Sequence, residues 1–405
     1  MKANSGLRSI CSVSTGCEND RFVGIKMLDG KPEVHFPIGF ALSADENDLR
    51  KDVCLLIGIL KAFQNRDSSS ISSNRSQNST ADFPILAYQR MVLRYLNYGD
   101  YHETENIFKQ ENRGKVNWAR TIKQIKPVFQ ESGPVYLNFI TKSSKPLNNS
   151  MLAEIYRYCV YLSFQNIGWL YTDKTIPKPR IRFNMDLFKA IVTEKLSVTN
   201  TDRDKELFTD MLAIINGHSE EGLEVADYLF GTFEFEYIWE KVIDRAFGIK
   251  DKKRYFPRSH WHLASAQANH ALEPDTIMVS NGIVYVLDAK YYRYGHSANP
   301  NHLPDTSSIH KQITYGEFIY EHPEFGFSQI YNAFLLPGDL QNGPFSCNNN
   351  FTYIGYADSE WKSNSHTFEK VAGIVVDTKY LLSNYKKPAL LADALSSVIR
   401  SNIST

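Results

Sequence analysis

The sequence is poor in cysteine and has no long apolar run. Its 405 residues include five cysteines, which are scattered and odd in number, and none of them lies in a C-x-x-C pair. This pattern disfavours a zinc ribbon and a disulfide scaffold. The first residues lack the apolar core of a signal peptide, and no window approaches about 18 uninterrupted apolar residues. We therefore expect a protein of the reducing cytoplasm that does not bind a membrane.

Two further absences limit the possible functions. No G-x-x-x-x-G-K-[ST] motif occurs, so the chain is expected to bind no nucleotide itself. The 45 Lys and Arg residues are balanced by 45 Asp and Glu residues, which leaves a net charge of zero. Any nucleic-acid surface must therefore be a local patch. A hydrophobic content of 42% is typical of a globular protein, and the length suggests two or three folding units.

The apolar pattern divides the chain into four predicted regions. Alternating apolar residues on either side of Asp29-Gly30 predict an early hairpin, and a helical period follows it. A Ser- and Asn-rich stretch then has almost nothing to bury. The regions are residues 1–66, a β-rich segment with a helix; 67–82, a flexible loop; 83–225, a mainly helical region that could dock DNA or a partner; and 226–400, an α/β domain.

The most informative stretch runs from Glu273 to Lys290, where Asn281-Gly282 separates two apolar segments. Asn-Gly in that position is the strongest local signal for a two-residue hairpin with a type I′ turn. Continuing that register outward brings Asp275 directly opposite Asp288. Cross-strand partners have Cβ atoms roughly 4.5–5.5 Å apart, and two carboxylates at that distance repel each other unless a cation lies between them. The turn therefore predicts a metal site.

Lys290 completes this group of polar residues. It lies two residues beyond Asp288, so the period of a strand places both side chains on one face. Two carboxylates and a lysine are the residues that a metal-dependent nuclease needs to hydrolyse a phosphodiester. Asp275 and Asp288 would hold Mg²⁺, for which Mn²⁺ could substitute. Lys290 would orient the attacking water or help deprotonate it. The alternative is a turn with a surface salt bridge, because P-D followed by D-x-K occurs by chance in many proteins.

Two helices predicted around the hairpin carry further candidates. Before it, residues 233–247 combine a broad apolar face with Glu236 and Glu240, which share one side at i, i+4 spacing. The alternative for either acid is a solvent-facing position on an amphipathic helix. After the hairpin, Gln312 and Tyr315 lie about one turn apart on a helix, so both could reach the same ligand or metal-bound water.

Two basic stretches could contact phosphates. Lys250 to Arg258 has aromatic residues interleaved and lies between the helix and the hairpin, which suits a strand edge resting on a phosphate backbone. Arg113 to Lys126 has five cations and no acid. Its alternative is a solvated helix face with Trp118, Ile122 and Ile125 packed inward. The residues predicted to bind DNA are Lys250, Lys252, Lys253, Arg254, Arg113, Lys115, Arg120 and Lys123.

Motifs along nearly the whole chain resemble the LlaJI restriction endonuclease family, whose members look like McrC, the nuclease subunit of modification-dependent restriction systems. The resemblance implies a PD-(D/E)xK nuclease core, a mixed sheet flanked by helices, preceded by a β-rich segment and a mainly helical region. It also implies catalytic roles for Asp275, Asp288 and Lys290, a helix acid that binds metal at Glu240 or, in reserve, Glu236, and an accessory role for Gln312. Related nucleases often show Q-x-x-x-Y, whereas Tyr315 comes one residue early. The motifs are Phe36–Gly39, Gly114–Ile122, Ile238–Val242, Pro274-Asp275, Asp288–Tyr292 and Lys311–Tyr315.

The function that this resemblance implies is a Mg²⁺-dependent DNA endonuclease of a bacterial restriction, or phage-defence, system. Its substrate would be double-stranded DNA, and its partner a separate McrB-like AAA+ GTPase that recognises and translocates DNA. Self-association is a further possibility. One alternative is an autonomous type II restriction enzyme that recognises its own site. Another is a non-catalytic subunit that binds DNA or a motor.

Overall fold

The computed structural model describes residues 6–63, 83–147, 150–217, 227–262 and 267–403. The predicted loop at 67–82 lies outside these residues. The chain forms two compact units, and the first combines residues 1–80 with 228–405, while the second contains residues 81–227. Helices and sheets occur in both units, which confirms a mixed α/β protein. None of the helices described is long and apolar enough to cross a lipid bilayer.

The first unit begins with a four-stranded sheet that pairs N-terminal strands with a strand from the second half of the chain. Its order is β1-β3-β2-β9, in which β9 arrives almost 200 residues after β2 along the chain. Asp29 and Gly30 have φ values of 50° and 69°, and they form the predicted turn between β2 and β3. The bounds are β1 Cys11–Val13, β2 Val23–Leu28, β3 Lys31–Phe36 and β9 Tyr228–Thr232, followed in chain order after β3 by α1 Glu46–Phe63.

A second sheet of the same unit has five strands in the order β12-β13-β14-β16-β15. The three central strands are parallel, and both edge strands are antiparallel to their neighbours. All seven residues of β13 are buried, as expected for a strand covered on both faces. The bounds are β12 Thr276–Ser280, β13 Ile283–Ala289, β14 Gln329–Gly338, β15 Phe351–Ala357 and β16 Val371–Asp377.

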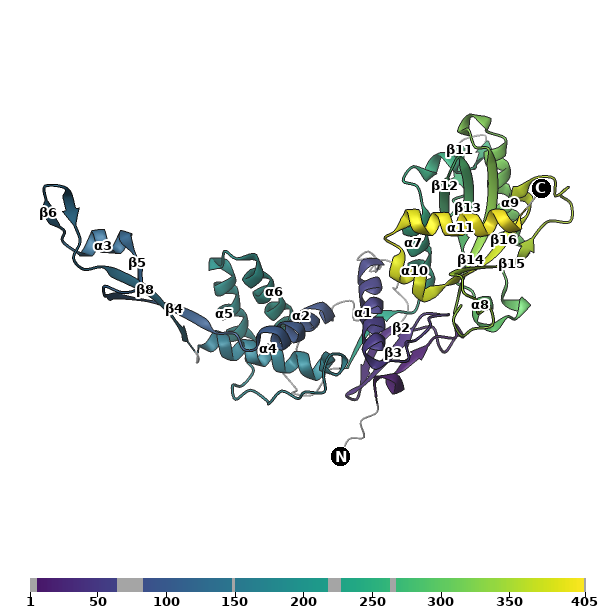
Figure 1. Cartoon of the computed structure of the whole chain (residues 1–405). Coiled ribbons are helices and arrows are strands. Elements are labelled where there is room, and N and C mark those ends of the chain that lie inside the picture. The colour runs from purple at the N-terminus through teal and green to yellow at the C-terminus, as the bar shows by residue number, and fades with distance from the viewer. Residues whose placement is uncertain (1–5, 64–82, 148–149, 218–226, 263–266, 404–405) are drawn as a thin grey trace. The chain divides into compact units, whose positions relative to one another are not determined.

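Helices cover both faces of this sheet (Figure 1). Val284 and Val286 of β13 pack with Tyr315 of α9 on one face. Tyr285 points to the opposite face, where Arg400 and Ser396 of α11 influence its hydroxyl. The last two helices of the described chain are α10 and α11. The bounds are α7 Phe235–Phe247, α8 Tyr294–Ser297, α9 Thr306–Tyr320, α10 Thr378–Asn384 and α11 Pro388–Asn402.

The N-terminal segment is tied to the five-stranded sheet by side chains. Ile38 is held twice, because its N–H donates to Tyr291 Oη at 2.8 Å and its carbonyl accepts from Thr378 Oγ1 at 2.9 Å. Lys379 forms an ion pair with the buried Asp52 of α1 at 2.7 Å. The regions 1–66 and 226–400, which the sequence analysis listed separately, therefore fold together.

The second unit combines a helical part with small sheets. Trp118 and Ile122 of α3 are 54% and 61% exposed, so the interpretation that they pack inward is wrong. Only Thr121 of α3 is buried, and it accepts a hydrogen bond from the N–H of Ile140. Strand β7 ends at Val135, and β8 begins at Ile140. The bounds are α2 Ile85–Tyr98, β4 Glu103–Gln110, β5 Lys115–Val116, α3 Trp118–Gln124, β6 Val128–Gln130, β7 Gly133–Val135, β8 Ile140–Leu147, α4 Met151–Ile167, α5 Met185–Val198 and α6 Asp202–Asn216.

Candidate active site

The hairpin of β12 and β13 has the predicted register. Pairing runs from Ser280 opposite Ile283 to Thr276 opposite Leu287. The turn residues Asn281 and Gly282 have φ values of 53° and 74°, as a type I′ turn requires. One step beyond the last pair, Asp275 precedes Thr276 and Asp288 follows Leu287. The two carboxylates are thus brought together by local turn chemistry.

Asp275 is held at the end of the hairpin by the main chain. Its Oδ2 accepts a hydrogen bond of 2.9 Å from the N–H of Ala289. Burial, followed by the charge of Asp288 and a hydrogen bond between the two carboxyl groups, raises the pKa of Asp275 from 3.8 to about 7. Two acids that cannot both ionise freely are the signature of an uncompensated negative site. A cation between them would remove this repulsion.

Lys290 lies beside these acids. Its Nζ is 2.8 Å from Asp288 Oδ2. Its N–H donates to the carbonyl of Leu335 at 3.0 Å, which continues the ladder between β13 and β14. Burial lowers the pKa of Lys290, but the charge of Asp288 more than offsets this effect and the pKa is raised overall. Lys290 therefore pairs with Asp288 as a cation.

Glu240 approaches the same group from α7. The helix is anchored by the fully buried Trp239, whose indole N–H donates to the carbonyl of Leu335 at 3.3 Å. Burial and then the charge of Asp288 raise the pKa of the half-buried Glu240, while Lys290 opposes the shift. Glu236, one turn earlier, contributes to the same shift. Sequence spacing had pointed to both acids, and both belong to this electrostatic group.

These residues fit a magnesium ion that keeps most of its waters. Within the described parts of the chain, no three His, Cys, Asp or Glu side chains form a ready metal cluster. Mg²⁺ usually takes only one or two carboxylates, with waters and substrate phosphates completing its octahedron. The carboxylate pair of Asp275 and Asp288, whose repulsion raises the pKa of Asp275, matches that need. Glu240 shares the electrostatic environment of this pair, because the charge of Asp288 contributes to its raised pKa.

Gln312 and Tyr315 lie on α9, next to β13. Gln312 is 1% exposed, and its Nε2 donates to the carbonyl of Val286 at 2.6 Å, so it ties the helix to the strand. Tyr315 is equally buried, and its hydroxyl finds no hydrogen-bond partner among the residues described. Burial, then the charges of Asp288 and Asp275, raise the pKa of Tyr315, which keeps the hydroxyl protonated. Within the described chain, the hydroxyl of Tyr315 is thus an unpaired donor that is affected by the charges of both acids.

The basic residues before the hairpin have different surroundings. Lys250, Lys253 and Arg254 are exposed. Lys252 instead forms an ion pair of 2.7 Å with Asp244 Oδ1 and donates to the carbonyl of Asp275 at 2.5 Å. Sequence reasoning missed Asp244, although it follows Glu240 by four residues and so lies on the same side of α7. Lys252 and Asp244 form what we call the corner clamp, because they join α7 to the Asp275 corner.

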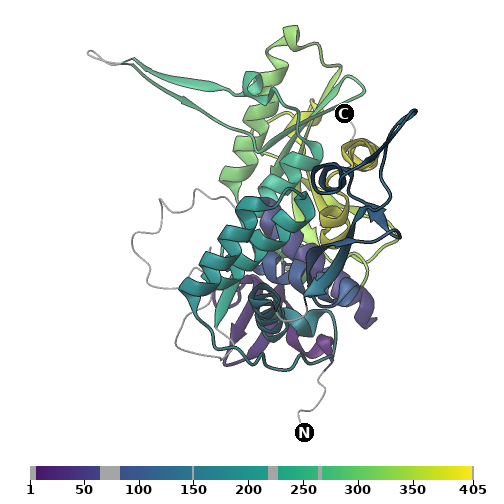
Figure 2. The same ribbon diagram turned by 90° about the vertical axis from the view of Figure 1, so that its left-hand side faces the viewer.

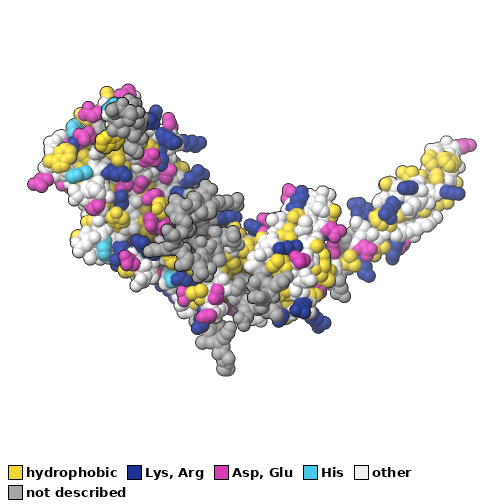
Figure 3. Space-filling model, turned by 180° about the vertical axis from the view of Figure 1, so that it is seen from behind, with side chains coloured by type: hydrophobic (Ala, Val, Ile, Leu, Met, Phe, Trp, Pro, Cys, Tyr) yellow, Lys and Arg dark blue, Asp and Glu magenta, His cyan; other side chains and the backbone are white. Residues whose placement is uncertain are grey.

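The predicted DNA-binding residues of the second unit are all exposed. They are Arg113, Lys115, Arg120 and Lys123. The Arg120 guanidinium lies 3.6 Å from the centre of the Phe108 ring, which is a cation–π contact. Basic and apolar side chains lie together on this part of the unit, at the right-hand end of Figure 3. This surface and the candidate active site belong to different units.

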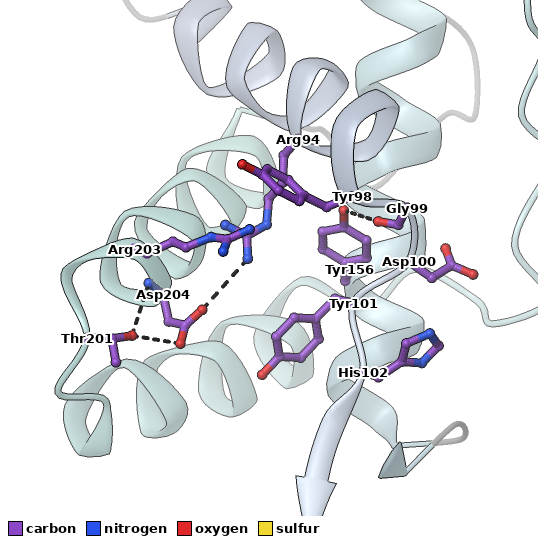
Figure 4. Close-up of a pocket in the computed structure, with 10 residues that line it drawn as sticks. All are labelled: Arg94, Tyr98, Gly99, Asp100, Tyr101, His102, Tyr156, Thr201, Arg203 and Asp204. Atoms are coloured by element: carbon purple, nitrogen blue, oxygen red, sulfur yellow. Dashed lines mark hydrogen bonds and ion pairs between the residues drawn. The ribbon is translucent and has the colours of Figure 1, made fainter.

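A separate cavity of about 350 Å³ lies within the second unit (Figure 4). Its polar groups largely satisfy one another. Tyr156 donates to the carbonyl of Gly99 at 3.0 Å, and Thr201 Oγ1 donates to Asp204 Oδ2 at 2.7 Å. Arg94 lies 3.7 Å from Asp204. None of the residues predicted from sequence lines this cavity, and its groups do not define a chemistry.

The fold and the paired acids describe an α/β protein with a candidate hydrolytic centre, and comparison with known proteins supplies the family. The model of the LlaJI restriction endonuclease family matches residues 22–375. This chain therefore belongs to the LlaJI restriction endonuclease family.

Two known proteins are similar to the chain. One is the type II restriction enzyme BsuMI component YdjA of Bacillus subtilis (strain 168), which is 24% identical over 324 residues, covering 74% of this chain and 68% of that protein. The other is a chain of a solved assembly of Thermococcus gammatolerans McrB AAA+ hexamers with bound McrC. It aligns over 92% of this chain and 82% of its own length, with 13% identity and a TM-score of 0.34.

Proposed function

We propose that this protein is a Mg²⁺-dependent deoxyribonuclease of the PD-(D/E)xK type that cuts DNA in a bacterial restriction system. The observation that carries the proposal is the pairing of Asp275 with Asp288 at the end of the hairpin, with Lys290 Nζ 2.8 Å from Asp288. Membership of a restriction endonuclease family supports the reaction class. Pro274-Asp275 and Asp288-Ala289-Lys290 supply the residues of the PD-(D/E)xK motif.

Each residue then has a distinct task. Asp275 and Asp288 hold the metal, and Mn²⁺ could replace Mg²⁺ in the same oxygen-rich site. When bound, the metal polarises the phosphodiester and lowers the pKa of a coordinated water. Lys290 is cationic, so it offsets charge on the phosphate oxygens and orients the attacking water by donating to it. Glu240 would lie beside the pair as a further acid, and its raised pKa brings it closer to the range of a general base.

Cleavage by variants tests the proposal. Asp288→Ala and Lys290→Ala should each reduce cleavage of plasmid DNA in Mg²⁺ by at least about 100-fold, since several kcal/mol of charge stabilisation are lost. Matched controls are Asp393→Ala and Lys386→Ala, which change exposed residues of the same unit. The melting temperature of each variant is measured as well, so that cleavage is compared at equal amounts of folded protein. Unchanged cleavage by Asp288→Ala would favour a non-catalytic subunit that binds DNA or a motor.

We further propose that the chain works with a separate AAA+ GTPase. Two observations support this. The chain has no P-loop of its own, and the Bacillus relative is named as one component of a restriction enzyme. That relative is also called a type II enzyme, which favours autonomous cleavage as the second candidate. Purified chain should therefore be assayed alone and, in the presence of GTP, with a P-loop GTPase if a neighbouring gene encodes one. Site-specific cleavage by the chain alone would select the autonomous enzyme.

A further inference from the structure

A basic segment of the sequence leads directly into the candidate active site. From Lys252 to Leu272 the chain has four Lys or Arg residues, three His residues and no Asp or Glu. This segment ends immediately before Glu273-Pro274-Asp275. Because the chain as a whole is neutral, a run of this kind is a local patch of the sort that a polyanion requires.

Part of the segment folds into a two-stranded ribbon. Strand β10, Arg258–His262, pairs antiparallel with β11, Gln267–Ala271. Figure 2 shows the ribbon extending away from the sheets and helices of its unit. Every residue of β10 is exposed, and Trp261 is 63% exposed. A lone two-stranded ribbon is marginally stable in water, so a ribbon with an exposed Trp gains from a partner that covers it.

The two faces of β10 differ in chemistry. The alternation of a strand places Arg258, His260 and His262 on one face. The rings of His260 and His262 lie 6.4 Å apart between centroids, which agrees with this placement. All three side chains carry N–H donors, and the face has no carboxylate. The opposite face of β10 presents Trp261.

The root of the ribbon is fastened beside the paired acids. The N–H of Leu272 donates to the carbonyl of Pro257 at 2.9 Å and closes the ribbon just before Glu273. Lys252, which precedes β10, donates to the carbonyl of Asp275 at 2.5 Å. A phosphodiester bound at Asp275 and Asp288 must therefore lie close to the point where the ribbon begins.

We propose that the ribbon of β10 and β11 binds the DNA duplex, lying in its major groove with the face of Arg258, His260 and His262 toward the phosphates and base edges. This proposal rests on the proposed nuclease function. The major groove is about 12 Å wide and admits a two-stranded ribbon. Arg258, at the root, contacts a phosphate, and the histidines contact base edges. The ribbon thus positions the duplex over the metal-binding acids.

Binding measured against salt tests the proposal without requiring cleavage. The full chain carrying Asp288→Asn is titrated onto a fluorescent duplex of about 30 base pairs at several salt concentrations. Arg258→Ala should weaken binding and lower the slope of log K against log salt by about 1, because one phosphate contact is lost. Arg258→Lys should restore the slope. The matched control is Arg245→Ala, which removes an exposed arginine from α7 and should leave the slope unchanged.

Crosslinking gives a second readout that does not depend on loss of binding. A photoreactive amino acid at position 260, on the face proposed to meet the DNA, should crosslink to the duplex, whereas the same group at the exposed position of Trp361 should not. An unchanged slope for Arg258→Ala together with no crosslink from position 260 would overturn the proposal. So would a crosslink from position 260 to the GTPase instead of DNA. Full cleavage by Asp288→Ala would contradict the proposed nuclease site. The salt dependence of binding would still test whether the ribbon contacts DNA.

Discussion

At the scale of single residues, Asp275 is positioned by the hairpin and is also a proposed metal ligand. Its carboxyl is fixed by the N–H of Ala289 and repelled by Asp288, so the residue is strained electrostatically in the absence of a cation. Natural proteins commonly concentrate perturbed carboxyl groups at functional sites. The same perturbation makes a prediction about stability that does not require the activity to be known.

The stability of the metal-free chain should fall as pH rises from about 4 to about 7. The pKa of Asp275 is raised from 3.8 to about 7, so over this window the folded chain holds a proton that the unfolded chain has released. Stability therefore decreases with pH, since the folded state binds more protons. Thermal melting in EDTA checks this expectation. Asp275→Asn should reduce the pH dependence, and an unchanged dependence would contradict the assignment.

Gln312 is expected to act in folding rather than in cleavage. Gln312→Ala removes the hydrogen bond to the Val286 carbonyl in a buried position, so the free energy of unfolding should fall by about 1–3 kcal/mol. Urea denaturation measures this change, with the exposed Gln341→Ala as its control. Cleavage per folded molecule should be kept. Lost cleavage at unchanged stability would instead support the accessory role that the resemblance implied.

At the scale of elements, the corner clamp aligns α7 with the hairpin. Lys252 bridges Asp244 of α7 and the carbonyl of Asp275, and Thr276 Oγ1 also donates to Asp244 at 3.3 Å. Glu240 on the helix and Asp275 on the hairpin are thereby held in a fixed relation. Outer partners of this kind usually matter for metal affinity as well as for geometry.

Breaking the corner clamp should weaken the affinity for Mg²⁺ more than the affinity for DNA. Lys252→Met should raise the Mg²⁺ concentration needed for half-maximal cleavage by about 10-fold or more, because the Asp275 corner is no longer held. Lys253→Met, at an exposed neighbouring position, is the control. A titration with Mg²⁺ at fixed DNA distinguishes them. If Lys252→Met changed only the salt dependence of DNA binding, Lys252 would be a phosphate contact, as its sequence context predicted.

Local signals in the sequence predicted the hairpin of the candidate site correctly. They could not predict contacts between residues that lie far apart in the sequence. The register of the hairpin followed from Asn281-Gly282, because a two-residue turn determines which residues face each other. The exposure of Trp118 and Ile122 did not follow, since a helical period cannot say whether a packing surface exists opposite it. The ion pair between Lys252 and Asp244 could not be predicted either, because the charge of a residue does not show whether it has a partner.

At the scale of the whole molecule, the N-terminal residues complete the unit that carries the candidate active site. Strand β2 pairs with β9 from Val23 opposite Thr232 to Met27 opposite Tyr228. Hydrophobic periodicity contains no information about a pairing so distant in sequence, which is why the sequence analysis listed the two regions apart. The site acids thus depend on residues more than 200 positions away for their scaffold.

A chain that begins at residue 226 should therefore fail to fold cooperatively. It would leave β9 without β2 and would expose the apolar surface that the N-terminal sheet and α1 cover. Circular dichroism during heating checks this expectation. As a control, a chain that keeps residues 1–80 and 228–405, joined by a Gly/Ser linker, should retain a sharp melting transition. A sharp transition for the chain that begins at residue 226 would contradict the prediction.

The second unit is an insertion, because the chain leaves the first unit near residue 80 and returns to it near residue 228. The paired acids, the lysine and Glu240 all lie outside the inserted residues. Over evolution, the insert can be lengthened, exchanged or redesigned without moving any of these four side chains. Relatives are therefore expected to diverge fastest between residues 81 and 227, where a change of binding partner leaves the hydrolytic scaffold intact.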